Sequence, residues 1–230
     1  EKGEISFAEL LRRIDQVDGL ERLRFATSHP KDMSDELIDC FGTLQKLCHH
    51  IHLPVQCGSN RILDAMNRGY HRDEYQQKVE RLKKACPDIR LTTDVIVGFP
   101  GETEEDFADT LDLVAQVGYA DAFTFLYSKR TGTAAADLAD DLTAAVKQQR
   151  FDRLLELQQK TSDDIWKGDL GSELEVLVEG ESKQGDGQIF GRTTWNRIVN
   201  FTGSPALVGR LVKVRINKVF RNSSLGELIE

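Results

Sequence analysis

The chain has 230 residues, of which 40% are hydrophobic and 30% are charged, and its formal net charge is −8. This composition is typical of a soluble globular protein with one large domain, or with a medium domain and a small one. No apolar stretch is long enough to cross a bilayer, and the polar start of the chain shows no signal peptide, so we expect a cytoplasmic protein.

Helix and strand patterns alternate over the first half of the chain. Apolar residues at helical spacing predict helices, and short apolar or alternating runs predict strands. Helices are expected at 7–17, 35–48, 59–69, 73–85 and 103–117, and strands at 20–26, 51–55, 89–97 and 122–127. Strand and helix therefore alternate four times, which predicts a parallel sheet with right-handed crossovers.

The ends of these strands are the expected functional positions, because ligands of parallel sheets bind where strands end. The four ends are 27–29, 56–59, 98–103 and 127–133, and all of them are polar or glycine-rich. We expect them to line one shared mouth. His29 directly precedes Pro30, and we favour a structural role for this histidine over contact with a ligand.

The segment from Asp94 to Phe107 is the most specific single feature. Its apolar run ends at Gly98, Pro100 and Gly101, and Thr103 then begins a helix whose first turn is acidic. This pattern predicts a buried strand, a tight turn and a helix N-terminus, where backbone N–H groups can hold a polar ligand.

The second half of the chain has a different pattern. A long helix at 142–166 is expected to connect two domains, and short β-branched runs then predict strands at 174–178, 188–192, 197–201, 211–216 and 227–229. Such strands predict a small closed or nearly closed barrel, a fold that often binds oligonucleotides. From Gln188 to Gly226 there is no Asp or Glu, and the segment carries Arg192, Arg197, Arg210, Lys213, Arg215, Lys218 and Arg221. This terminal segment is therefore basic although the chain as a whole is acidic.

The cysteines do not indicate a metal site. Cys40, Cys48, Cys57 and Cys86 form no Cys-x-x-Cys pair, and their spacing fits neither a zinc site nor an iron–sulfur site. We expect four reduced thiols.

Four motifs together resemble one family. They are His52-Leu-Pro-Val-Gln-Cys-Gly-Ser59, Met66-Asn67-Arg68-Gly69-Tyr70, Ile96-Val-Gly-Phe-Pro-Gly-Glu-Thr103 and Tyr127-Ser-Lys-Arg130. Through them the chain resembles the methylthiotransferase family of radical S-adenosylmethionine (SAM) enzymes, and its C-terminal part resembles a TRAM domain, an RNA-binding β-barrel. The resemblance implies an α/β fold with part of a radical SAM (β/α) barrel at 1–140, a connecting helix at 141–166 and a small OB-like TRAM barrel at 167–230.

The activity that the resemblance implies is modification of tRNA. The run Gly191-Arg-Thr-x-x-Asn196-Arg197 resembles the branch that adds a methylthio group to C2 of N6-isopentenyladenosine next to the anticodon. The implied cofactors are S-adenosylmethionine and [4Fe–4S] clusters. The implied partners are the tRNA anticodon stem-loop and a reductant for the cluster, and we expect a monomer with no membrane partner. Alternative substrates are threonylcarbamoyladenosine in tRNA and a ribosomal protein.

The chain departs from the family at the cluster. The radical cluster needs a Cys-x-x-x-Cys-x-x-Cys loop, which this chain does not contain. By the resemblance, the chain is the C-terminal part of the enzyme, with four barrel strands and the whole TRAM domain. We therefore expect no catalytic residue and no metal ligand here, and the isolated chain is alternatively a non-catalytic RNA-binding module.

The candidate cofactor-binding residues lie at the strand ends and are Ser28, Gln56, Asp94, Gly98 and Phe99. Gln56 either hydrogen-bonds the cofactor or target base, or is an amide satisfied by the neighbouring backbone. Gly98 would let an adenine ring approach the backbone closely. Asp94 either faces the barrel and binds ribose or amino groups, or pairs with a lysine outside it.

The candidate substrate and RNA contacts lie further along the chain. Arg130 and Thr133 follow the last strand of the sheet and are expected to contact a phosphate or carboxylate. In the TRAM segment we expect backbone contacts to RNA from Arg192, Asn196, Arg197 and Lys213, an exposed Trp195 that stacks on an unpaired base, and a core position for Phe201.

Overall fold

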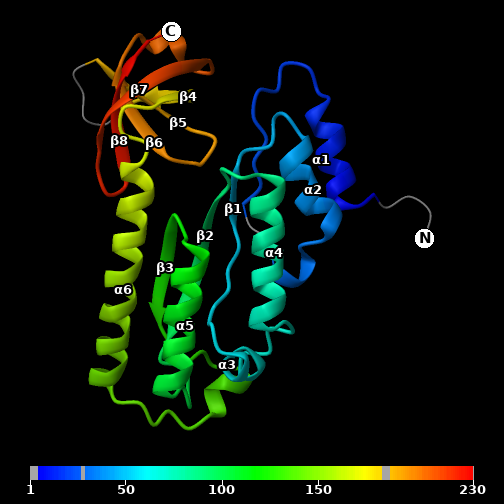
Figure 1. Cartoon of the computed structure of the whole chain (residues 1–230), viewed down its shortest axis with the longest axis vertical. Helices are drawn as coiled ribbons and strands as arrows, with labels where there is room; N and C mark the ends of the chain where they lie inside the picture. The colour runs from blue at the N-terminus through cyan, green and yellow to red at the C-terminus, as the bar shows by residue number, and fades with distance from the viewer. Residues whose placement is uncertain (1–4, 27–28, 183–186, 230) are drawn as a thin grey trace.

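The computed structural model describes residues 5–26, 29–182 and 187–229. It contains a three-stranded parallel sheet covered by helices and a closed five-stranded barrel, and one long helix connects them (Figure 1). Within the described ranges, no helix combines the length and the apolar character needed to cross a membrane.

The sheet part has strand order β1-β2-β3 with all pairs parallel. Its elements are α1 (Phe7–Asp15), η1 (Pro30–Asp32), α2 (Asp35–Thr43), β1 (His50–His52), α3 (Asn60–Ala65), α4 (Arg72–Ala85), β2 (Arg90–Val97), α5 (Glu104–Val117), β3 (Asp121–Leu126) and η2 (Ala134–Asp137). The predicted helices and three of the four predicted strands are found, with α2 and α3 shorter than expected.

The predicted strand at 20–26 is wrong over its described residues. Leu23 makes a single parallel bridge to Leu47, and no further ladder forms. The arginines on both sides of Leu23 point their guanidinium groups at the second domain, where they bond to Arg192 O and Asn196 Oδ1. This segment therefore contributes side-chain contacts between domains, and the described sheet has three strands.

The two faces of the sheet differ because strand side chains alternate. Along β2, Leu91, Val95 and Val97 are buried in the core that α4 and α5 share with the sheet. The opposite face carries Asp94 and Ile96 beside their β3 partners Phe123 and Phe125, whose rings are 55% and 50% exposed. One face is thus covered by helices, and the other is open.

The second part begins with α6 (Ala144–Lys167), which starts at the Thr143 cap and packs along β3. The barrel then comprises β4 (Glu173–Glu181), β5 (Gln188–Arg192), β6 (Ile198–Thr202), η3 (Pro205–Leu207), β7 (Leu211–Val219) and β8 (Ser223–Leu228), closed in the order β4-β5-β6-β8-β7. The inward-facing residues form a separate core of Val176, Val178, Ile189, Val199, Phe201, Val212, Val214 and Ile216. The predicted core position of Phe201 is confirmed.

Arg90 joins the barrel to the amino ends of the sheet strands. Its guanidinium bonds both carboxylate oxygens of Asp169, at 3.0 and 2.5 Å. Its planar group also lies between two indoles, 4.4 Å from the Trp166 ring and 4.1 Å from the Trp195 ring. Planar stacking combined with a bidentate ion pair is the geometry that suits arginine and not lysine.

Further contacts hold the same end of the sheet to the loop between β5 and β6. Arg24 donates to Asn196 Oδ1 at 2.7 Å and to Thr193 O at 3.2 Å. The backbone N–H of His49 donates to Thr194 Oγ1 at 2.9 Å. The barrel is therefore docked at the amino ends of the strands, and their carboxyl ends point away from it (Figure 1).

We expect Arg90→Ala to lower the free energy of unfolding by about 3 kcal/mol, because it leaves the Asp169 carboxylate buried and unpaired. The Asp169 side chain is only 8% exposed. Urea denaturation followed by tryptophan fluorescence measures the change. The matched control is Arg215→Ala, whose pair with Glu173 is about half exposed on both sides, and it should cost less than about 1 kcal/mol. Equal losses for the two variants would contradict the role of Arg90.

Candidate functional site

A cleft of about 840 Å³ lies at the carboxyl ends of the strands, at the end of the sheet opposite the barrel. It brings together five of the predicted site residues, namely Gln56, Asp94, Phe99, Arg130 and Thr133. Ser28, a predicted cofactor-binding residue at the first strand end, lies outside the described residues. Three of the four predicted strand ends therefore meet at one cleft.

Gln56 enters the cleft from an unusual backbone conformation. Its φ is 72°, in the left-handed region that non-glycine residues rarely occupy. The conformation is held by its neighbours on β2, because Gln56 N donates to Asp94 O and Ile96 N donates to Gln56 O, at 2.9 and 2.8 Å. Such conformations cost free energy and occur most often at ligand sites.

Asp94 lies on the open face of the sheet and lines the cleft. Its carboxylate is 3.5 Å from Nε2 of His52, which approaches from β1. The observed partner is therefore a histidine on the same face, and the alternative of a lysine outside the barrel is not what the structure shows. A half-exposed carboxylate at the mouth of a cleft is suited to accept hydrogen bonds from hydroxyl or ammonium groups.

The loop after β2 is fixed by a buried ion pair. Gly98 N donates to Glu102 Oε2 at 3.0 Å, and Arg150 of α6 bonds the same oxygen at 2.7 Å. The two side chains are 1% and 5% exposed. Burial raises the pKa of the Glu102 carboxyl, while the bonds from Arg150 and Gly98 act in the opposite direction. This pair ties the loop to α6.

Gly98 is required for a reason that differs from the prediction. Its φ is 75°, and an added Cβ would lie 2.7 Å from Cγ of Lys147. The positive φ by itself favours glycine here, and the side chain of Lys147 on α6 would also have to shift to admit a Cβ. Gly98 is buried, and the adjoining Phe99 lines the cleft.

Asp106 joins two of the loops that form the cleft. One oxygen accepts from Ser59 Oγ at 2.6 Å, and the other accepts from the backbone and hydroxyl of Thr103 at 2.8 and 2.7 Å. Arg61 also pairs with this carboxylate. Burial by itself would raise the pKa of Asp106, but these donors together hold it well below the usual range. The predicted Thr103 cap is confirmed, and the structure adds that its partner Asp106 also holds the 56–59 loop.

The aromatic wall of the cleft pairs Phe99, a predicted cofactor-binding residue, with Tyr127, to which the sequence gave no binding role. Phe99 and Tyr127 meet edge to face at 5.2 Å, and the Tyr127 hydroxyl donates to Ala135 O at 3.0 Å. Phe125 and the turn at Met66–Arg68 complete the lining. An aromatic residue at the end of a predicted strand was the available signal for Tyr127.

His29 has the structural role that its position before Pro30 predicted. Its Nδ1 accepts from Lys31 N at 3.2 Å and caps η1, and its ring lies 5.6 Å from Tyr70. Burial is the main cause that lowers the pKa of His29, so the ring tends toward the neutral form that accepts this bond.

The predicted RNA contacts of the barrel are largely engaged inside the protein. Arg197 is 6% exposed, and its guanidinium donates to the carbonyls of Phe220, Arg221 and Ser223. Asn196 adopts φ 65° and accepts from Arg24, so it forms part of the domain interface. Arg197 therefore has little exposed polar surface for a phosphate contact, while Asn196 is partly exposed and its RNA contact stays a prediction.

Trp195 and Arg192 are also occupied. The prediction that Trp195 is exposed is wrong, because its ring is half-buried beneath Arg90, and its Nε1 is buried without a hydrogen-bond partner among the described residues. Arg192 pairs with Glu179 at 3.1 Å and donates to Asn196 O. Lys213 remains on the outer face of β7, opposite Glu175 of β4 in the strand register.

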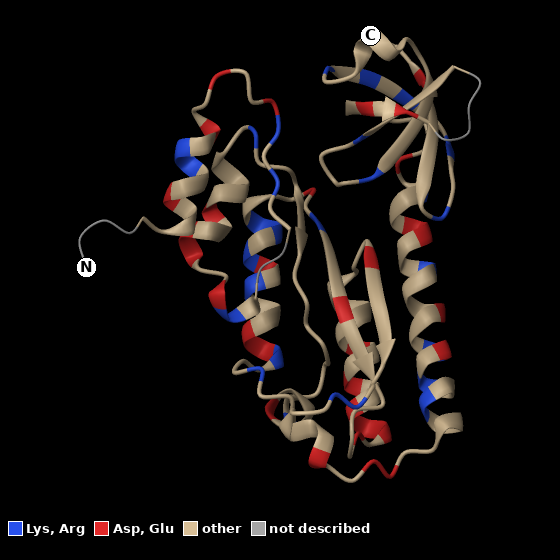
Figure 2. Ribbon diagram, turned by 180° about the vertical axis from the view of Figure 1, so that it is seen from behind, with Lys and Arg blue, Asp and Glu red and all other residues tan. Residues whose placement is uncertain are grey.

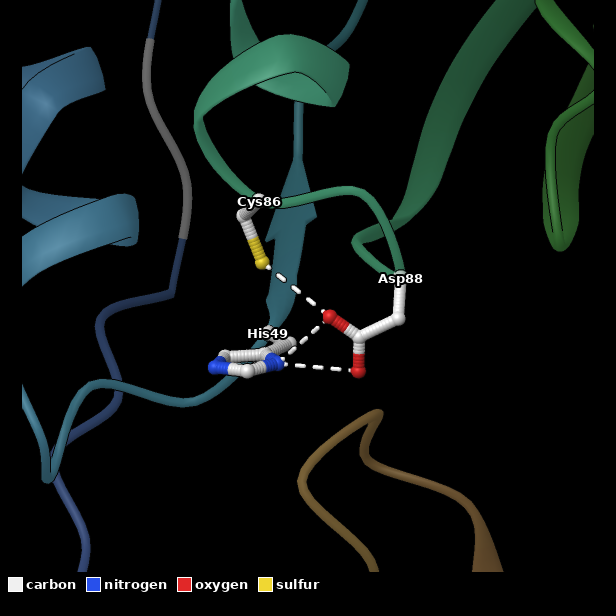
Figure 3. Close-up of side chains that lie close together, drawn as sticks. All are labelled: His49, Cys86 and Asp88. Carbon is white, nitrogen blue, oxygen red and sulfur yellow. Dashed lines mark hydrogen bonds and ion pairs between the residues drawn. The ribbon is translucent and has the colours of Figure 1, made fainter.

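The cysteines do not provide a cluster site. All four are buried, and Cys57 is bonded to Thr110 Oγ1, with burial raising the pKa of its thiol to about 11. Among the described residues, His49, Cys86 and Asp88 form the group of three side chains whose potential metal-ligand atoms lie close together. Figure 3 shows these side chains bonded to one another, with Nδ1 of His49 2.8 Å from the Asp88 carboxylate. A [4Fe–4S] cluster does not fit this set, because only one member is a cysteine.

As the pH is lowered, we expect the free energy of unfolding to fall more steeply in the wild type than in Asp106→Asn. A carboxyl whose pKa is lowered in the folded state stabilises fully above its unfolded pKa of about 4 and loses that stabilisation as the pH falls. At neutral pH, Asp106→Asn should cost about 2 kcal/mol through weakened charged hydrogen bonds. Urea denaturation between pH 3 and pH 6 measures both effects. An unchanged pH slope in the variant would contradict this role.

Comparison with known proteins agrees with this arrangement. Residues 2–114 match the family model of the Radical SAM superfamily, and residues 169–229 match that of the TRAM domain. The tRNA-2-methylthio-N(6)-dimethylallyladenosine synthase of Syntrophotalea carbinolica is 59% identical over 229 residues, which cover 100% of this chain and 52% of that protein. The synthase of the same name from Acetivibrio thermocellus is 53% identical, and the match covers 97% of this chain and 47% of that protein.

A solved structure shows the same fold. Coproporphyrinogen III oxidase from Escherichia coli, described as a radical SAM enzyme, aligns with a TM-score of 0.54 at 14% identity, over 91% of this chain and 49% of that one. The chain spans about half the length of the curated relatives that it matches. Through its parallel-sheet part this chain belongs to the radical SAM superfamily, and it carries a TRAM domain at residues 169–229.

Proposed function

We propose that this chain is the cofactor-holding and RNA-binding part of a tRNA methylthiotransferase that adds a methylthio group to C2 of N6-isopentenyladenosine next to the anticodon. The observation that carries the proposal is the cleft at the carboxyl ends of the strands, in a chain 59% identical to a relative named for that product. Parallel sheets bind their ligands at this end.

The cleft residues suit S-adenosylmethionine. The Asp94 carboxylate can accept from ribose hydroxyls or the ammonium group, and the Gln56 amide can both donate and accept. Phe99 and Tyr127 offer apolar surface to an adenine ring. Arg130 and Thr133, at the rim, are suited to the negative groups of the substrate. When bound together with a cluster, this cofactor supplies a radical and a methyl group.

The cysteines that hold the radical cluster lie outside this chain in our proposal. The buried thiols described above do not form a three-cysteine set, so this chain alone should not cleave S-adenosylmethionine. We propose that the cluster belongs to a longer parent protein, of which the relatives suggest the chain is about half, and that a separate reductant supplies its electrons.

The remaining proposals concern organisation and setting. We propose domain boundaries of 1–140, 141–166 and 167–230, which α6 at Ala144–Lys167 and the family matches support. We propose that the TRAM domain binds the tRNA anticodon stem-loop, and that the parent works as a cytoplasmic monomer without a membrane partner.

We expect Asp94→Asn to weaken binding of S-adenosylhomocysteine about tenfold, the effect of losing one charged hydrogen bond of about 1.4 kcal/mol. Isothermal titration calorimetry on the 230-residue chain measures this. The matched control is Asp88→Asn, because Asp88 also pairs with a histidine but lies at the opposite end of the sheet. No binding by the wild type, or equal weakening by both variants, would overturn the assignment of the cleft.

The reaction itself is tested on the parent protein. After anaerobic reconstitution with iron and sulfide, the parent should form methylthiolated isopentenyladenosine in tRNA, detected by mass spectrometry of digested RNA. The 230-residue chain, treated in parallel, should release no 5′-deoxyadenosine. Product found only on a ribosomal protein, or 5′-deoxyadenosine released by the chain alone, would contradict the proposal.

A further inference from the structure

The turn between β7 and β8 carries an exposed aromatic ring. Phe220 is 45% exposed, whereas Phe201 in the core of the same barrel is fully buried. Among the described residues of the barrel, no other aromatic side chain is as exposed, and Phe220 takes no part in the barrel core. A large apolar surface left in water is costly for the free protein and is therefore a feature to explain.

The turn is held rigidly from beneath. Phe220 N donates to Ser223 O at 2.8 Å, and the Arg197 guanidinium donates to Arg221 O at 2.9 Å, to Ser223 O at 2.8 Å and to Phe220 O. Arg197 in turn lies over the Trp166 ring at 4.5 Å. The buried arginine therefore fixes the position of the exposed ring, and a ligand that binds the ring does not have to order the turn.

A cation lies against the ring. Lys218 Nζ is 4.9 Å from the Phe220 ring centroid, and Arg221 follows the ring in the chain, with its side chain in a hollow that Asp121 also lines. Within the described part of the chain neither makes an ion pair within contact distance, whereas Arg215 and Arg192 are paired with Glu173 and Glu179 on β4. Figure 2 shows Lys and Arg on the barrel turn next to the end of α6. Lys218 therefore places an unpaired positive charge beside the exposed ring.

We infer that Phe220, with Lys218 beside it, forms a stacking site for an unpaired base of the bound RNA, and this inference rests on the proposed RNA-binding function of the TRAM domain. Unpaired bases stack on exposed aromatic rings of RNA-binding barrels, and neighbouring cations contact the phosphates on either side. In this inference Phe220 performs the base stacking that the sequence analysis predicted for Trp195. The Trp195 ring instead contacts Arg90.

The test measures binding of an unmodified tRNA transcript to the 230-residue chain by fluorescence anisotropy at fixed salt. Phe220→Ala should raise the dissociation constant about tenfold, since one stacked base contributes about 1–3 kcal/mol. Phe220→Trp should bind as tightly as the wild type or tighter. Val208→Ala, which removes another exposed apolar side chain of the same barrel, should change binding less than about twofold.

Two further readouts separate stacking from charge and from misfolding. Lys218→Gln should reduce the slope of log affinity against log salt by about one, while Phe220→Ala should leave that slope unchanged. Phe220→Ala should also leave binding to a fully paired RNA duplex unchanged, which a misfolded barrel would not do. If the wild type binds tRNA and Phe220→Ala binds equally well, the stacking site is refuted while RNA binding stands. If the wild type binds no tRNA, the proposed RNA-binding function fails with it.

Discussion

The Arg90 guanidinium is the most buried charged contact between the two domains and holds them together with the bonds from Arg22, Arg24 and His49. Arg90 is the first residue of β2, and it lies between the rings of Trp166 and Trp195 while it bonds both oxygens of Asp169. A charge removed from water in this way is stable only while its carboxylate partner and the flat surfaces on both sides remain. The contact therefore fixes the barrel at the amino ends of the strands and leaves their carboxyl ends open.

This arrangement separates the two proposed binding regions. The cleft lies where the strands end, the barrel lies where they begin, and α6 runs between them with 24 residues, or about 36 Å of helix. One RNA that reaches both regions has to extend along the molecule. Recognition by the barrel and presentation of a base to the cleft are therefore distinct tasks, and the fixed domain contact sets the distance between them.

Local sequence signals predicted the local structure well. The acidic first turn and Thr103 identified the start of α5, and the glycine turn before it was found as expected. Such signals do not predict contacts between residues that are far apart in the sequence. The Trp195 ring was expected to be exposed because its neighbours are polar, but Arg90, far away in sequence, covers it. Likewise no local pattern indicates that Lys147 on α6 packs against Gly98.

The central claim is that the cleft formed by Gln56, Asp94 and Phe99 holds S-adenosylmethionine. An experimental structure of the chain or its parent with that compound bound tests the claim most directly. The account predicts that the adenosine group lies against these three residues at the carboxyl ends of the strands. Density for the compound at the opposite end of the sheet, or a cleft left empty while the compound occupies another site, would contradict it.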